Sequence, residues 1–112
     1  MSKAKEIEIT GAKRKKFRTG AYPAVELGNS TLYSVSFTVK YAACSTDNQT
    51  VASMKTGAPL SRGLCLLTAV YATVHTPGGN TPATPYTSSG TSYSQFCCIF
   101  YKGNYVVTRV EW

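Results

Sequence analysis

The 112-residue chain has few charged side chains, 15% of the total, and it holds a single histidine and a single aspartate. Catalytic triads and carboxylate pairs need acids and bases that converge in space. His75, Asp47 and a cysteine are the only such set that can be drawn. We interpret His75 as a strand-end residue beside a Thr-Pro-Gly loop, and we predict that the protein is not an enzyme and needs no cofactor or small-molecule substrate.

Long apolar runs are also missing. No stretch approaches the length of a membrane span, and the first twenty residues lack the apolar centre of a secretory signal. We therefore predict no membrane partner and no secretion, with localisation to a virion or to the host cytoplasm. In such reducing surroundings the four cysteines are expected to be buried thiols rather than disulfides.

Metal-binding motifs are absent from the cysteine pattern as well. Cys97 and Cys98 are adjacent, so on a strand their side chains point to opposite faces. Cys44 and Cys65 are far apart, and no C-x₂-C pair occurs. Structural zinc sites normally show paired ligands at short spacing, so no metal site is predicted.

Positive charge is concentrated at the N-terminal end of the chain. Residues 1–18 carry seven bases and two acids, a net +5, whereas residues 19–112 carry five bases and three acids, a net +2, which together give the total of +7. A cluster of five bases in six residues binds polyanions without sequence preference, and an aromatic ring inside it can stack on bases. The predicted nucleic-acid-binding residues are Lys13, Arg14, Lys15, Lys16, Phe17 and Arg18.

Two segments alternate between apolar and polar residues, as strands do. Residues 5–10 place Ile7 and Ile9 on one face, and residues 32–44 keep the same period over a dozen positions rich in β-branched and aromatic types. We predict a strand with one buried face over 32–44, whose inward side chains are Tyr33, Val35, Phe37, Val39, Tyr41 and Ala43.

The middle of the chain gives weaker signals. Residues 45–58 are interpreted as a connection with one helical turn capped by Asp47 or Thr46. Residues 60–75 fit either a helix or a buried strand, because leucines fall at helical spacing while Thr, Val and Tyr favour a strand. Residues 76–95 consist almost entirely of Thr, Ser, Pro, Gly, Tyr and Asn, and are expected to form a long loop.

The C-terminal residues 95–112 are predicted to form a hairpin. Gly103-Asn104 between two apolar runs predicts a type II′ turn, which sets Lys102 opposite Tyr105 and Phe100 opposite Val107. One face, expected in the core, collects Cys97, Ile99, Tyr101, Val106, Val110 and Trp112. The other face, expected to contact another chain, collects Phe96, Cys98, Phe100 and Val107, together with the oppositely charged Arg109 and Glu111.

These patterns predict an all-β fold, a small antiparallel sandwich or barrel over residues 21–112 behind a basic N-terminal arm over residues 1–20. Low surface charge, many Ser and Thr, and apolar faces on both sides of the hairpin favour a subunit that assembles with its own copies. The composition resembles that of small viral or phage coat and decoration proteins. The predicted interface residues are Phe96, Cys98, Phe100, Val107, Tyr86 and Tyr93.

Two other functions remain open from the sequence. The chain could be a small β module that binds RNA or DNA through residues 13–18 and exposed aromatic side chains. It could instead be an effector that blocks a partner protein with an apolar hairpin face. A homo-oligomer that meets nucleic acid through its arm is the function that we expect.

Overall fold

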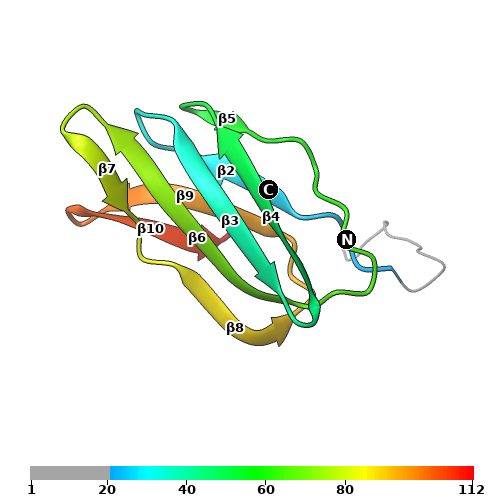
Figure 1. Ribbon diagram of the computed structural model, residues 1–112. Helices are drawn as coiled ribbons and strands as arrows, with labels where there is room; N and C mark the ends of the chain where they lie inside the picture. Colours follow the sequence, from blue (N-terminus) through cyan, green and yellow to red (C-terminus); the bar gives the residue numbers. More distant parts are fainter. Residues whose placement is uncertain (1–20) are drawn as a thin grey trace.

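Residues 21–112, the part of the chain that the computed structural model describes, contain nine strands and no helix (Figure 1). Four strands form one sheet in the order β10-β9-β2-β5. They are β2 (Glu26–Asn29), β5 (Lys55–Thr56), β9 (Gln95–Tyr101) and β10 (Asn104–Arg109). The strand candidate at 5–10 and the basic cluster at 13–18 lie outside the described residues.

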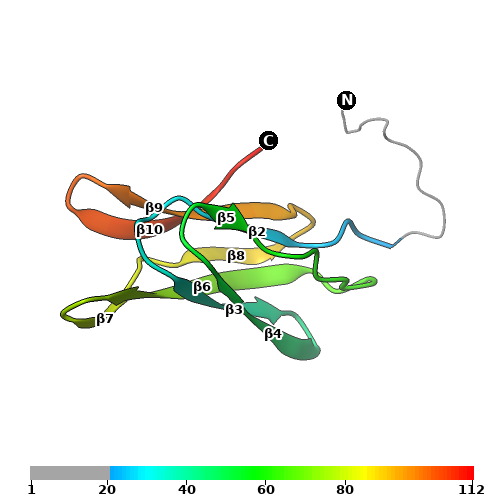
Figure 2. The same ribbon diagram turned by 90° about the horizontal axis from the view of Figure 1, so that it is seen from above.

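The second sheet has five strands. Its order is β4-β3-β6-β7, and β8 pairs with the other end of β6. The strands are β3 (Val35–Tyr41), β4 (Cys44–Val51), β6 (Leu67–Thr76), β7 (Gly79–Pro82) and β8 (Tyr86–Thr91). Figure 2 shows the two sheets as stacked layers, so the all-β prediction is confirmed. The pair β2–β9 is parallel, however, and the four-stranded sheet is therefore mixed.

The core lies between the sheets and follows the alternation of β3. Val35, Phe37 and Val39 are at most 1% exposed, and Ser36 and Thr38 face outward. The predicted strand at 32–44 is thus confirmed over 35–41. It ends at a tight turn, where Ala43 takes a φ of 60°. The facing sheet contributes Leu27 and other apolar side chains, namely Phe96, Cys98 and Val107.

Two predicted connections are strands. Residues 44–51 form β4 instead of a loop with a helical turn, because their polar side chains pair across the sheet: Asn48 accepts a hydrogen bond from Thr38, and Thr50 lies 3.1 Å from Ser36. The expected loop at 76–95 contains β7 and β8. The open choice at 60–75 resolves to a strand from Leu67 onward, with Val70 and Val74 inside and Tyr71 outside.

The turn between β9 and β10 differs from the predicted one. Its two central residues are Lys102 and Gly103, with φ angles of 50° and 84°, and the flanking pair is Tyr101 with Asn104. Two successive positive φ values define a type I′ turn, whose twist matches that of the strands. Phe100 consequently pairs with Tyr105 instead of Val107, a register shift of two residues.

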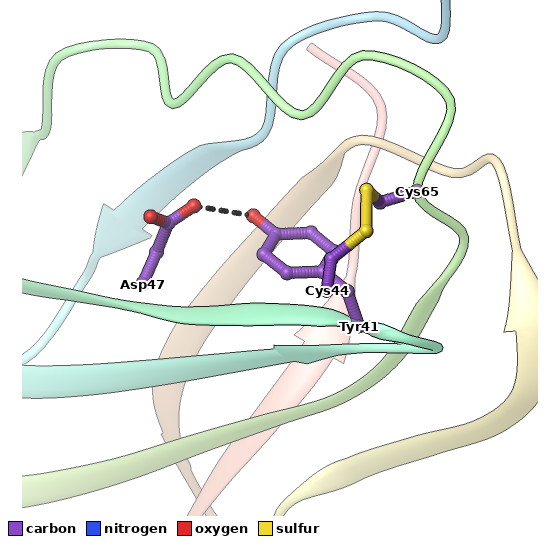
Figure 3. The surroundings of a disulfide bond; sticks show 4 residues. All are labelled: Tyr41, Cys44, Asp47 and Cys65. Carbon is purple, nitrogen blue, oxygen red and sulfur yellow. Dashed lines mark hydrogen bonds between the residues drawn. A yellow bond between two sulfur atoms is a disulfide. The ribbon is translucent and has the colours of Figure 1, made fainter.

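A disulfide bond joins Cys44, at the start of β4, to Cys65, just before β6 (Figure 3). The prediction of reduced thiols is therefore wrong for this pair, and it is confirmed for Cys97 and Cys98, which are free and buried. Beside the bond, the Tyr41 hydroxyl donates a hydrogen bond to Asp47 at 2.7 Å. Burial, together with this carboxylate, raises the pKa of Tyr41 above its ordinary range.

Arg62 holds the segments around the sandwich edge together. Its side chain is 6% exposed and donates hydrogen bonds to the carbonyl oxygens of Pro23, Thr91, Ser92 and Tyr93. A guanidinium group has five N–H donors in a planar fork, so one side chain can bind several carbonyls at once. Arg62 thereby connects the chain before β2 to the connection between β8 and β9.

Candidate functional site

The six predicted interface residues separate into buried and exposed groups. Phe96, Cys98 and Val107 are at most 3% exposed and belong to the core, so they are not available to another chain. Alternation had grouped these side chains on one face correctly, but that face packs against the second sheet. Tyr86 is half-buried, with its ring 4.7 Å from that of Phe96.

The other two interface residues lie on the surface. Phe100 is 59% exposed near the β9–β10 turn, and Tyr93 is 48% exposed under the guanidinium of Arg109. The predicted nucleic-acid-binding residues, Lys13 to Arg18, lie outside the described part of the chain, and their prediction stands as made.

The outer surface of the four-stranded sheet is apolar. It presents side chains that were predicted to form the core of the hairpin, and we call it the apolar outer face: Ile99, Tyr101, Val106 and Trp112. Of the other two residues of that predicted set, Cys97 is only 7% exposed and Val110 is half-buried. Ile99 pairs with Val106 across the β9–β10 ladder, and both are half-buried. Tyr101 and Trp112 are 56% and 57% exposed. This face places large apolar surface next to solvent.

Trp112 is fixed on this face by contacts from β2 and β9. The chain leaves β10 on the outer side of the sheet (Figure 2), and the Trp112 ring lies over Gly28, where a Cβ atom would come within 3.4 Å of it and of the Cys97 sulfur. The indole N–H donates to Glu26 at 3.3 Å, and the Trp112 backbone N–H donates to Gln95 at 3.3 Å. A Cβ atom at this position would therefore stand at ordinary van der Waals distance from the ring and the sulfur.

A cavity of about 170 Å³ opens beside Trp112. Its wall includes Cys97, whose thiol lies 3.3 Å from the Ser30 hydroxyl, together with Met54 and Lys55 from the segment that contains β5. The neighbouring Cys98 faces the core, and burial raises its pKa to about 11. Of the two free thiols, only Cys97 lies beside the cavity.

The outer surface of the five-stranded sheet is polar instead. Hydroxyl and amide side chains from β3 and β4 bond to one another across the strands, and His75 from β6 joins them. Ser36 Oγ lies 2.7 Å from His75 Nε2, and His75 Nδ1 lies 2.8 Å from Asn80 Oδ1. The sequence places these three residues on β3, β6 and β7, and the sheet register brings them into one hydrogen-bonded row.

This row was missed in the sequence, where His75 was interpreted as an isolated strand-end residue. A local sequence signal does indicate the His75–Asn80 half of this row. Thr-Pro-Gly-Gly follows His75, and Pro-Gly pairs mark tight turns, so a hairpin there sets His75 opposite Asn80. The partner Ser36 depends on the pairing of β3 with β6, which has no local signal.

Asp47, which the sequence allows as a partner of His75, accepts a hydrogen bond from the Tyr41 hydroxyl instead. Within residues 21–112, His, Cys, Asp and Glu side chains form no group of three or more that could hold a metal ion. The same residues include no helix with the length and apolar character of a membrane span.

Comparisons of the chain with protein-family models, curated proteins and solved structures find no match.

Proposed function

We propose that this chain is a non-enzymatic structural subunit that assembles with copies of itself, in the manner of a viral or phage coat or decoration protein, and that its basic cluster contacts the packaged nucleic acid. The apolar outer face is the single observation that carries this proposal. We assign the interface between copies to this face, and not to Phe96, Cys98 and Val107, which the sequence predicted for it and which are in the core.

The apolar outer face has the properties of a surface between copies. Interface centres are depleted in charge and enriched in Tyr, Trp and other large apolar side chains. Ile99 and Val106 form the middle of this face, and Tyr101 and Trp112 stand at its ends. A second copy that covers these side chains would remove apolar area from water, which is the main favourable term in association.

The charge distribution supports the proposed contact between the basic cluster and nucleic acid. The body beyond residue 18 carries only +2, so copies can approach one another without strong repulsion, and the +5 segment in front supplies the attraction for a polyanion. Binding by this segment would fall steeply with salt, since each neutralised phosphate releases condensed counterions.

The disulfide supports a virion over the cytoplasm. Bonds such as Cys44–Cys65 persist in oxidising surroundings, which include the exterior of a particle, and are rare in the cytosol. We therefore propose that the chain resides in a particle that leaves the reducing interior of the host cell.

Size exclusion with light scattering, recorded at protein and nucleic-acid wavelengths, tests the proposal on the full chain. The expected result is a multimer of the 12.1 kDa chain that carries nucleic acid at low salt. A variant with glutamine at the five basic positions of the cluster is expected to keep the multimer mass and lose the nucleic acid. A monomer that retains nucleic acid would instead identify a binding module, and a monomer that binds none would reject both halves.

A further inference from the structure

We propose that Ser36 is a nucleophilic serine, acylated by activated esters and thioesters of small carboxylic acids, with His75 as its general base and Asn80 as the residue that positions His75. The proposal goes beyond the assembly function and assigns chemistry to the opposite, polar face. It rests on the row of hydrogen bonds that crosses β3, β6 and β7.

The distances are those of one neutral tautomer of His75. In the neutral imidazole, with the Asn80 Oδ1 atom as acceptor, the proton is on Nδ1 and Nε2 keeps its lone pair. In this tautomer the Ser36 hydroxyl donates to Nε2, 2.7 Å away, and Ser36 Oγ is free to accept from the Thr50 hydroxyl at 3.1 Å. This is the tautomer that a general base for Ser36 requires.

The arrangement matches the geometric definition of an activated nucleophile. Such a site has the nucleophile within about 2.6–3.2 Å of a base and a third group that orients the base. The Ser36–His75 and His75–Asn80 distances of 2.7 and 2.8 Å meet both conditions. An asparagine fills the third position, so the orienting group is neutral.

The row is also held rigidly and reached from solvent. Ser36 lies on β3, which pairs with β4 on one side and β6 on the other, and His75 pairs directly with Asn80. The Ser36 and His75 side chains are half-buried, while Asn80 and Thr50 are exposed. An acyl donor can therefore approach Ser36 from the open side of the sheet without any change in the fold.

The reaction is an acyl transfer. Ser36 Oγ bonds to the carbonyl carbon while its proton moves to His75 Nε2. The tetrahedral adduct then collapses, the bond to the leaving group breaks, and the leaving group departs with its electron pair. The proton on His75 passes to the leaving group or to solvent. The products are an ester on Ser36 and a free alcohol, phenol or thiol.

The local backbone sets the class of acyl donor. Backbone amides beside Ser36 pair with β4 and β6, so they do not face the developing oxyanion, and the Thr50 hydroxyl is the neighbouring donor. Without strong oxyanion stabilisation, the barrier falls only when the leaving group is good. Activated esters and thioesters meet this requirement, whereas amides do not.

The test uses the full chain, p-nitrophenyl acetate as the acyl donor, and peptide mapping by mass spectrometry. Ser34 and Ser36 lie between Arg18 and Lys40 and fall in one tryptic peptide, so Ser34 is an internal control for ordinary serine reactivity. We expect acetylation of Ser36 to be at least about 100-fold faster than that of Ser34, the size of a general-base effect. Equal rates at the two serines would overturn the proposal.

Variants separate the chemistry from simple exposure. His75→Gln keeps a polar side chain but lacks the base, and it is expected to reduce acetylation of Ser36 to the rate of Ser34. Asn80→Ala is expected to lower the rate and Asn80→Asp to restore it, since the carboxylate also accepts from Nδ1. Thr38→Ala, which removes another hydroxyl of the same face, is the control expected to change nothing. An unaltered rate in His75→Gln would also overturn the proposal.

Discussion

Breaking the bond between Cys44 and Cys65 is expected to lower the stability of the domain strongly. The bond closes a loop with a sequence separation of 21 residues, from Cys44 at the start of β4 to Cys65, two residues before β6 begins (Figure 3). In the chain-entropy model, a loop of this length restricts the unfolded state by about 3.3 kcal/mol. That is a large part of the 5–15 kcal/mol by which small domains are typically stable.

The perturbation can be made chemically and genetically. Adding a reductant to the wild-type chain and replacing both cysteines by serine are expected to have the same effect, a fall of roughly 15 °C in the thermal midpoint, given the unfolding entropy of a domain of about 90 residues. The double variant also serves as the control for the reductant, which should not change the thermal midpoint of a chain that lacks the disulfide. Cys97 and Cys98 are free in either case.

Thermal unfolding followed by circular dichroism measures the midpoint, and a thiol titration of the denatured, unreduced chain counts the free cysteines. The titration should find two thiols in the wild type. Four thiols would show that the bond does not form. Two thiols with a midpoint that reduction shifts by less than about 3 °C would refute the reasoning from loop entropy.

Other predictions concern the core and its buried polar groups. Phe37→Ala is expected to lower the free energy of unfolding, measured by urea titration, by about 3–5 kcal/mol, since the side chain is 1% exposed. A loss below about 1 kcal/mol would contradict its place in the core. Arg62→Met should cost about 2–3 kcal/mol, because four backbone carbonyls lose their charged donor, whereas Lys102→Met at the exposed turn should cost little. Burial raises the pKa of Cys98 from about 9 to about 11, so the folded state keeps a proton that the unfolded state releases. Stability should therefore be full below pH 9 and fall toward pH 11, with a smaller fall in Cys98→Ala; identical pH profiles would contradict this explanation.

The sequence predicted a strand well where its two faces meet different surroundings. On β3, Val35, Phe37 and Val39 alternate with hydroxyl side chains, so both the strand and its buried face follow from the pattern. On β9 and β10 both faces are apolar. Alternation sorted their residues into the correct two groups, but inside and outside were exchanged, because the second sheet that decides between them is distant in sequence.

Register and long-range pairing were the parts that local patterns could not supply. Gly103 marked a turn, yet Lys102-Gly103 and Gly103-Asn104 are both acceptable two-residue turns, and the wrong choice moved the pairing by two residues. Cys44 and Cys65 meet only because the β3–β4 turn reaches the loop before β6. Neither position carries a sequence signal for the other.

The candidate sites also depend on long-range pairing that local sequence patterns do not predict. Ser36 and His75 are 39 positions apart, and only the pairing of β3 with β6 brings them to hydrogen-bonding distance. The cavity beside Trp112 likewise combines β2, β5, β9 and the C-terminal residue. In contrast, the basic cluster at 13–18 is contiguous, which is why composition alone could identify it.

Sedimentation equilibrium of two matched variants tests the assembly interface most directly. Ile99→Arg places a charge in the middle of the apolar outer face, and Tyr71→Arg places the same charge on the exposed, polar face of the other sheet. The wild type and Tyr71→Arg are expected to sediment as multimers, and Ile99→Arg as a folded 12.1 kDa monomer. A wild type that is monomeric at every concentration, or an Ile99→Arg variant with the mass of the wild-type multimer, would contradict the account.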